Sequence, residues 1–573
     1  MNISFRGAVV VLIWFATPLA FAAPSPALPN LPVTDDGTQI LHPDSRPLTR
    51  SAASRFLKQA TFGPTRSQID ELVVQNNLSA WIDEQMVLPV STTLPYVQAN
   101  SNGSLRTTRH YIWWHNVMRG EDQLRQRVAF ALSQIFVISD LDYSLGNAQF
   151  GVSHYYDMLG AQAFGNYRDL LDRVARHPTM GIYLSMVRNR RAEPALNIRP
   201  DENFAREILQ LFSVGLTQLA PDGRPVPVNA PAPTYTQDTV EAFARVFTGW
   251  NFADSPGTWV SNDVTGYDKT LYMVADYNPA PPNAYHDTQA KTLLDGASLP
   301  DSSASATPAE DDLAAALDNI FNHRNVGPFF GRLLIQRLTT SNPSPAYVSR
   351  VAARFDDNGS GVRGDLGAVV KAILLDPEAR HGRRQNADFG KAKEPIMRLT
   401  QLWRALDAVP GVASEADFFR TYAKPSDRID EILGQAVMRS PSVFNFYLPD
   451  HPLPGAGPSG RVAPEMQILT EANVGATNNM LFQQIYTFHN RNPDGADNVA
   501  RVNIDPLVAV ADDVDRLIED LNTLLLAGGM PVAMRATLKA HLLAIDDSPE
   551  GLDKRALDAL FLIAASPLFM VQH

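Results

Sequence analysis

One short segment, residues 285–291 (YHDTQAK), places three residues that could do chemistry close together: His286, Asp287 and Lys291. Histidine is the side chain best suited to move protons near neutral pH, because its ordinary pKa lies close to that range. A carboxylate beside it can fix the tautomer of the ring or join it as a second ligand of a metal ion. The alternative is that His286 and Asp287 end a strand and pair locally.

A second group of polar residues lies on the segment 201–215 (DENFAREILQLFSVG), whose apolar residues recur at the spacing of a helix that faces a core. Its other face carries carboxylates, an amide and an arginine: Glu202, Asn203, Arg206 and Glu207. Such a face is suited to binding a polar ligand. The alternative is an i,i+4 ion pair between Glu202 and Arg206, together with an acid near the positive end of the helix dipole.

The segment 236–250 predicts another helix, which Thr236 caps and which carries Arg245 on its polar stripe. The connection between the two helices is short for their length, which favours antiparallel neighbours. A hairpin after the second helix would return the chain near its end. We therefore expect 201–215, 236–250 and 286–291 to converge in space.

Converging in this way, the three segments would assemble an acid–base site. The catalytic candidates are three carboxylates and the imidazole: Glu207, Glu202, His286 and Asp287. The candidates for holding an anionic or polyhydroxyl substrate are three cations and one amide: Asn203, Arg206, Arg245 and Lys291. A divalent metal held by carboxylates and His286 is a variant of the same hypothesis.

The composition restricts the chemistry further. The 573 residues are 45% hydrophobic and 19% charged, as in an ordinary globular protein. The formal net charge of −12 makes nucleic acids and anionic membrane surfaces poor partners. The chain has no cysteine, which excludes thiolate catalysis, iron–sulfur clusters, cysteine-ligated zinc and haem attached through Cys-x-x-Cys-His.

The N-terminal residues 1–22 have the pattern of a secretory signal peptide. Arg6 precedes an apolar stretch that is too short for a comfortable membrane span, and Ala-Phe-Ala at residues 20–22 supplies a cleavage signal. Residues 23–46 are rich in proline and small polar residues, as in a linker. No later stretch is long and apolar enough for a stable membrane span. We therefore expect a periplasmic or secreted protein.

The remaining residues, 47–573, predict one large domain that is mainly α, an orthogonal helical bundle. Helical periodicity disappears between residues 251 and 308. In this excursion, short strands at 258–260 and 271–274 suggest a small β-hairpin.

Other features of the sequence carry less information. Trp113, Trp114 and Trp250 could stack on sugars, but at helical spacing tryptophans are more typical of a core. A Gly-x-Gly-x-x-Gly run at residues 359–364 matches a dinucleotide-binding fingerprint by letter, but it follows a helix rather than a strand. No serine-hydrolase elbow, zinc-binding His-Glu-x-x-His or phosphate-binding loop occurs.

Several stretches together resemble a known family. They are PDENFAREILQLFSVGL at 200–216, TYTQDTVEAFARVFTGW at 234–250, HDTQAKTLL at 286–294, KAKEP at 391–395 and AASPLFMVQ at 564–572. They are similar to the large bacterial family catalogued as domain of unknown function 1800, from about Phe56 to Gln572. The resemblance implies an exported protein whose gene often lies beside that of a sulfatase-like exported protein. Similar proteins commonly carry a glutamate where this chain has Gln210, so the resemblance does not support an essential acid there.

Two functions remain open. The first is an exported enzyme, in which Glu207, Arg245 and His286 surround one open cleft. The second is a non-enzymatic exported scaffold or chaperone for a sulfatase-like partner. In a scaffold the same residues would be buried and mutually satisfied, with an apolar patch exposed elsewhere. The positions and exposure of these three side chains therefore distinguish the two functions.

Overall fold

The structure is a computed structural model in which the following residues are described: 47–102, 104–254, 268–277, 285–385, 389–410, 432–455, 460–492 and 499–573. All of them belong to the second of the two compact units into which the chain divides, Ser45–His573. The predicted signal peptide and linker lie outside the described residues.

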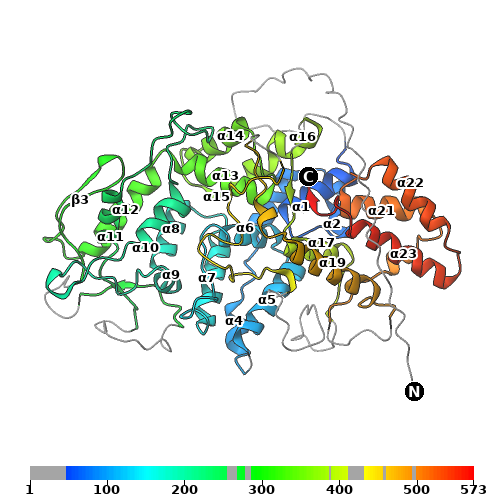
Figure 1. The fold of residues 1–573 in the computed structure, drawn as a ribbon, viewed down its shortest axis with the longest axis horizontal. Helices are drawn as coiled ribbons and strands as arrows, with labels where there is room; N and C mark the ends of the chain where they lie inside the picture. The colour runs from blue at the N-terminus through cyan, green and yellow to red at the C-terminus, as the bar shows by residue number, and fades with distance from the viewer. Residues whose placement is uncertain are drawn as a thin grey trace. The chain divides into compact units, whose positions relative to one another are not determined.

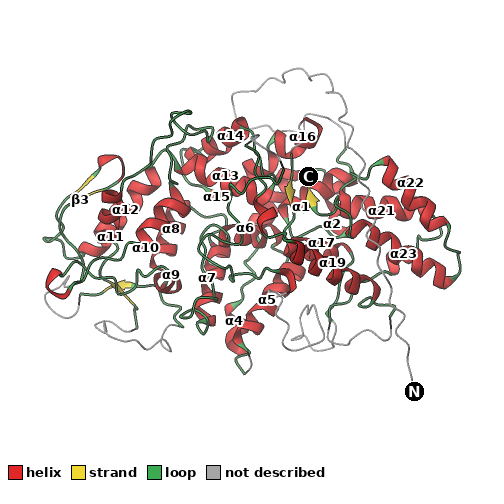
Figure 2. Cartoon of the chain, in the orientation of Figure 1, coloured by secondary structure: helices red, strands yellow, loops and turns green. Residues whose placement is uncertain are grey.

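Helices make up most of the described chain, and the predicted fold class, mainly α with small β-hairpins, is confirmed (Figure 2). The first helices are α1 (Arg50–Ala60), α2 (Arg66–Gln75), α3 (Leu78–Val87), α4 (Leu94–Ala99), α5 (Leu105–Arg119), α6 (Gln123–Ser133), α7 (Gln149–Ala161), α8 (Tyr167–Arg176) and α9 (Pro178–Tyr183). At the start of α2, the hydroxyl of Thr65 accepts from the amide of Gln68, and the Gln68 side chain accepts from the amide of Thr65. This reciprocal capping fixes where the helix begins.

The segment predicted as one helix over 201–215 is divided in two. A 3-10 turn, η1 (Pro194–Leu196), precedes α10 (Asn203–Glu207), which continues directly into a π-helix, η2 (Ile208–Ser213). The next helix is α11 (Gln237–Val246), which packs against both α10 and α12 (Pro308–Asn322) (Figure 1).

Helix α11 leads into the excursion, whose strands are very short. β1 (Trp250–Asn251) pairs antiparallel with β2 (Val274–Ala275), and β3 (Lys291–Thr292) pairs antiparallel with β4 (Ser298–Leu299) across the turn η4 (Leu294–Gly296). The expected partner of 271–274, residues 258–260, lies outside the described residues. Val274 pairs instead with Asn251, directly after α11.

The remainder of the described chain contains helices, the loops that join them and one more strand pair. Its helices are α13 (Val326–Leu338), α14 (Pro345–Asp356), α15 (Leu366–Leu375), α16 (Pro377–Gln385), α17 (Pro395–Ala405), η6 (Pro464–Gln467), α19 (Glu471–Tyr486), α20 (Asp505–Val508), α21 (Val514–Leu526), α22 (Val532–Leu543) and α23 (Pro549–Ala564). β5 (Lys391–Ala392) pairs antiparallel with β6 (Val571–Gln572) near the C-terminus. Within the described ranges, no helix has the length and apolarity needed to cross a membrane.

One connected hydrophobic cluster runs through these elements from α1 to α23. It includes Trp113, Trp114 and Trp250, of which none is more than 3% exposed. The ring of Trp114 packs edge-on against Trp113 at 5.1 Å and against Trp403 at 5.3 Å between centroids. These tryptophans therefore belong to the core and offer no face on which a sugar could stack.

Candidate functional site

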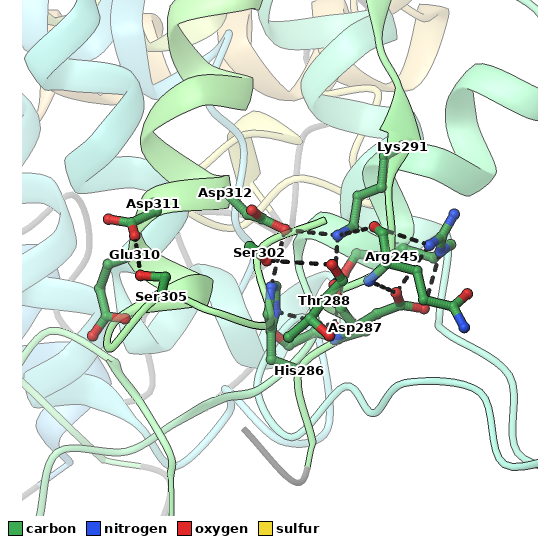
Figure 3. A network of polar contacts seen from close by, with 12 residues as sticks. Arg245, His286, Asp287, Thr288, Lys291, Ser302, Ser305, Glu310, Asp311 and Asp312 are labelled. Atoms are coloured by element: carbon green, nitrogen blue, oxygen red, sulfur yellow. Dashed lines mark hydrogen bonds and ion pairs between the residues drawn. The ribbon is translucent and has the colours of Figure 1, made fainter. Parts of the chain in front are cut away.

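The predicted site residues of the excursion form a buried polar network with α11 and α12 (Figure 3). Its centre is Asp312 of α12, whose Oδ2 accepts from His286 Nε2 at 3.1 Å and from Lys291 Nζ at 2.6 Å. His286 and Asp312 are each 1% exposed, and Lys291 is 3% exposed. We call this set, with Arg245, Thr248 and Asp287, the His286 network.

The imidazole of His286 is held on both sides. Its Nδ1 donates to the carbonyl oxygen of Thr248 at 2.9 Å, and its Nε2 faces Asp312. Both ring nitrogens therefore face oxygen atoms of the protein rather than solvent. The close approach depends on Gly249, which has φ +87°, and a Cβ there would lie 2.8 Å from that of His286.

Asp287 is paired with Arg245 by two parallel hydrogen bonds, Nε to Oδ2 and Nη2 to Oδ1, each 2.9 Å long. Its backbone amide also donates to the hydroxyl of Thr248 at 2.9 Å. Arg245 and Lys291 both donate to the carbonyl oxygen of Gln289, at 3.2 and 2.9 Å. A bidentate arginine–carboxylate pair of this kind fixes orientation as well as supplying energy.

The charges of the network are mutually stabilised. Burial raises the pKa of Asp312, but hydrogen bonds from His286 and Lys291 outweigh burial, so that pKa lies below its ordinary value. Burial also raises the pKa of Asp287, and the hydrogen bond and charge of Arg245 more than reverse this effect. Both carboxylates are therefore held in the ionised form.

The predicted residues of α10 form a separate group. Glu202 and Arg206 make an i,i+4 ion pair of 2.8 Å, and the side chain of Gln237 on α11 donates to the same oxygen of Glu202 at 2.9 Å. Asn203 is exposed at the first position of α10. This arrangement is the local ion pair that the sequence left open as the alternative to ligand binding.

Glu207 is a predicted carboxylate with a buried oxygen that lacks a hydrogen-bond partner. It is 7% exposed, and its Oε2 is buried without a hydrogen-bond partner. Burial raises the pKa of Glu207, with Arg206 opposing the shift. The hydroxyl of Tyr235, which interacts electrostatically with Glu207, also lacks a partner.

The structure thus brings Arg245, His286, Asp287 and Lys291 together. In the described part of the chain, no hydrogen bond or ion pair links Glu207 to His286. Sequence reasoning missed Asp312, although a signal was present. Asp312 shares a helical stripe with Ala309 and Ala316, which are fully buried, so a carboxylate there needs a cationic partner.

The KAKEP stretch forms a second buried ionic cluster. Lys391 Nζ lies 2.8 Å from Glu465 Oε1 and donates to the carbonyl oxygen of Arg337 at 2.9 Å. The Oε2 of Glu394 accepts from the side-chain amides of Gln134 and Gln435. These residues join segments far apart in the sequence, as expected of a structural polar core.

A third buried cluster surrounds Asp140. Its Oδ2 accepts from Arg109 Nη2 at 2.8 Å and from Arg106 Nε at 2.9 Å, and its Oδ1 accepts from Arg439 Nη1 at 2.7 Å. Burial raises the pKa of Asp140, but the positive charges of Arg109 and its neighbours lower it well below the ordinary range. This cluster joins the loop after α6 to the loop that contains Arg439.

Two clefts open elsewhere, beside α1 and the turn that follows α21, and neither is lined by a residue of the His286 network. Among the residues that the structure describes, no three histidine, aspartate or glutamate side chains gather where they could hold a metal ion. The network therefore lies inside the protein rather than in the wall of either cleft.

The protein is thus a mainly helical one in which buried ionic clusters join distant segments. It belongs to the family described as protein of unknown function DUF1800, whose model matches residues 55–571. No curated protein and no solved structure matches the chain.

Proposed function

We propose that the chain is a non-catalytic exported scaffold that binds a second exported protein. The observation that supports this function most directly is the position of Asp312, which occupies Nε2 of His286 and Nζ of Lys291 inside the protein. A general acid or base must come within hydrogen-bond reach of its substrate. A ring that is 1% exposed, with both nitrogens in use, is instead suited to holding the fold together.

A surface suited to a protein partner lies on two loops that are joined to each other. Asp140 N donates to Met438 O at 3.0 Å, and Ser139 and Arg439 form a β-bridge. Both loops expose large apolar side chains: Leu141 (51%), Tyr143 (83%), Phe444 (44%) and Leu448 (38%). Exposed apolar side chains on loops fixed by a buried ionic cluster favour partner binding, because little order is lost on docking. We call these the apolar loops.

The family resemblance supplies the candidate partner, a sulfatase-like exported protein. The test measures binding of that purified protein to the wild-type chain and to a Tyr143→Ser, Phe444→Ser double variant by surface plasmon resonance. We expect the double variant to bind at least about tenfold more weakly, since exposed aromatic residues often carry much of the energy at interfaces. The matched control is Val74→Ser on α2, which removes an apolar side chain that is 86% exposed elsewhere.

A companion measurement addresses catalysis. In a scaffold, His286→Gln lowers the free energy of unfolding, because a buried hydrogen-bond network is broken. A His286→Gln variant as stable as the wild type would instead favour an enzyme, since catalytic residues commonly add nothing to stability. Absence of binding by the wild-type chain would reject the scaffold.

A second candidate function is favoured by Glu207. Its unpartnered oxygen and raised pKa are properties of a general acid, and it lies immediately before the π-helix η2. If the chain is an enzyme with this residue as the acid, Glu207→Gln abolishes turnover in a screen of chromogenic phosphate, sulfate and glycosyl esters. Because the substitution removes a carboxyl group whose Oε2 is buried without a hydrogen-bond partner, we expect the variant to be at least as stable as the wild type.

A further inference from the structure

Two histidines are bonded directly to each other where α9 packs against α7 and α8 (Figure 1). The Nδ1 atom of His154 on α7 lies 2.9 Å from the Nε2 atom of His177, the residue that caps α9. The two rings are stacked, with 5.0 Å between their centroids. His177 is fully buried, and His154 is half-buried. We call these two residues the histidine pair.

The backbone fixes which nitrogen of each ring carries the proton. The amide of Thr179 donates to Nδ1 of His177 at 3.2 Å, and an amide N–H cannot accept in return. The neutral ring of His177 therefore carries its proton on Nε2 and donates it to Nδ1 of His154. His154, which accepts at Nδ1, carries its own proton on Nε2. Both rings are neutral in this chain of hydrogen bonds.

A proton added to either ring breaks one of these hydrogen bonds. If His154 gains a proton on Nδ1, two N–H groups face each other in place of a donor and an acceptor. His177 can relieve this conflict only by carrying its proton on Nδ1, where it faces the amide of Thr179 and abolishes the cap of α9. A proton added directly to Nδ1 of His177 abolishes the same cap. The histidine pair is therefore intact only while both rings are neutral.

The histidine pair supports residues 268–277, the segment that contains β2. The ring of Tyr272 packs edge-on against both imidazoles, with centroid distances of 6.0 and 5.7 Å. The next residue, Met273, donates its amide to the carbonyl oxygen of Arg176 at the end of α8, at 2.8 Å. β2 then pairs with β1, directly after α11. The state of the histidine pair therefore bears on how firmly this part of the excursion is held against α8 and α9.

The titratable groups near the histidine pair include two phenols, two arginines and four carboxylates. They are Tyr155, Tyr272, Arg173, Arg176, Asp157, Asp172, Asp268 and Glu310. Both arginines lie over the Tyr272 ring, with Cζ 6.0 and 5.8 Å from its centre. Each of the four carboxylates accepts a hydrogen bond from a partner other than the two histidines. These surroundings do not favour a positive charge on either ring.

Burial acts in the same direction. It lowers the pKa of His154, and burial together with the charge of His154 lowers the pKa of His177 well below its ordinary value. If the segment above the pair opens, water reaches the rings and their pKa returns to about 6.5. At a pH of about 5, each exposed ring is then protonated about 30 times more often than it is neutral. Acid therefore stabilises the open form relative to the closed form.

We propose that the histidine pair is a pH-sensitive switch whose protonation detaches residues 268–277 from α8 and α9 while the rest of the chain stays folded. Local opening of this kind needs only the loss of the few contacts that hold one short segment. The switch is independent of the His286 network and of the scaffold function.

The test is hydrogen–deuterium exchange of the full chain, measured by mass spectrometry at a pH of about 7.5 and of about 5, on either side of the ordinary histidine pKa. After correction for the intrinsic exchange rates, we expect protection of residues 268–277 to fall about tenfold or more at the lower pH, because open segments take up protons. Protection of α21 and α23, which lie outside the histidine pair, should be retained.

The variants His154→Asn and His177→Asn each replace a ring that can take up a proton with an amide that cannot. Either variant should make the fall in protection smaller, and the double variant should abolish it. The matched control is His541→Asn on α22, where the ring bonds to Asp558 at 2.9 Å, and this variant should behave as the wild type does.

The single variants keep the test decisive if the double variant does not fold, and protection of α21 and α23 at the higher pH shows which variants are folded. The proposal is overturned if the wild type protects residues 268–277 equally at both pH values. It is also overturned if the folded variants show the same fall as the wild type, or if α21 and α23 lose protection to the same extent as residues 268–277.

Discussion

Asp312 offers the sharpest test of the idea that the His286 network is structural. The variant Asp312→Asn keeps the shape of the side chain but removes the charge that faces His286 and Lys291. A hydrogen bond to a charged group contributes about 1.5–3 kcal/mol, and Asp312 accepts two of them. An asparagine oxygen can still accept weakly. We therefore expect Asp312→Asn to lower the free energy of unfolding by about 3 kcal/mol, the lower end of the range for breaking a buried ion pair.

Urea unfolding at pH 7 measures this loss, with Asp318→Asn as the control on the same helix. Asp318 pairs with Arg168 at 2.6 Å, but its side chain is 61% exposed, so its loss should cost at most about 1 kcal/mol. The double variant Asp312→Leu, Lys291→Met should recover stability relative to Asp312→Leu alone, because it leaves no unpaired lysine in the interior. If Asp312→Asn unfolds at the same urea concentration as Asp318→Asn, the network is not structural.

The same network predicts how stability depends on pH. The pKa values of Asp287 and Asp312 are lower in the folded chain than in the unfolded chain, where they lie near about 4. Above that pH, Asp287 and Asp312 are ionised in the folded and in the unfolded chain, and they contribute fully to the free energy of unfolding. As the pH falls below it, the unfolded chain takes up protons first, and stability is lost. In Asp312→Asn, this acid-dependent loss should be shallower than in the wild type.

Two further predictions concern Gly249 and His177. Gly249→Ala should destabilise the protein by about 2 kcal/mol or more in urea unfolding, because it combines a strained φ with a clash against His286. An unchanged midpoint of the urea transition would show that the turn at Gly249 is not tightly packed against His286. Burial, with the charge of His154, lowers the pKa of His177 well below 6.5, so stability should fall as the pH drops below about 6.5, by up to about 1.4 kcal/mol per pH unit. Nδ1 of His177 caps α9 by accepting from Thr179 N, so His177→Asn should keep the cap. The variant should make the fall of stability below pH about 6.5 less steep. If the slope of stability against pH is unchanged in the variant, groups other than His177 cause it.

The sequence predicted the helical framework because its signals are local. Capping residues and apolar residues at helical spacing act within one or two turns, as at Thr65 and Gln68. The meeting of Arg245 with Asp287 was also predictable, since a short excursion must return to the end of α11. The π-helix was not, because widening the helix after Glu207 depends on packing rather than on the residues themselves.

The site was harder to predict than the fold, for a physical reason. A histidine beside an aspartate is compatible with catalysis and with a buried ion network, and only exposure distinguishes them. Exposure of His286 is decided by Asp312, 26 residues further along the chain. The KAKEP stretch has the same ambiguity, since Lys391 and Glu394 find their partners in segments that no local pattern connects.

The bond between Arg245 and Asp287 has one more consequence for a chain without cysteine. It joins residues 42 positions apart and therefore closes a loop of the size that a disulfide often closes in exported proteins. Unlike a disulfide, this ionic cross-link exists only in the folded chain and leaves the unfolded chain unrestrained. The protein can therefore close the excursion without an oxidant, reductants do not open it, and acid is the condition that releases it.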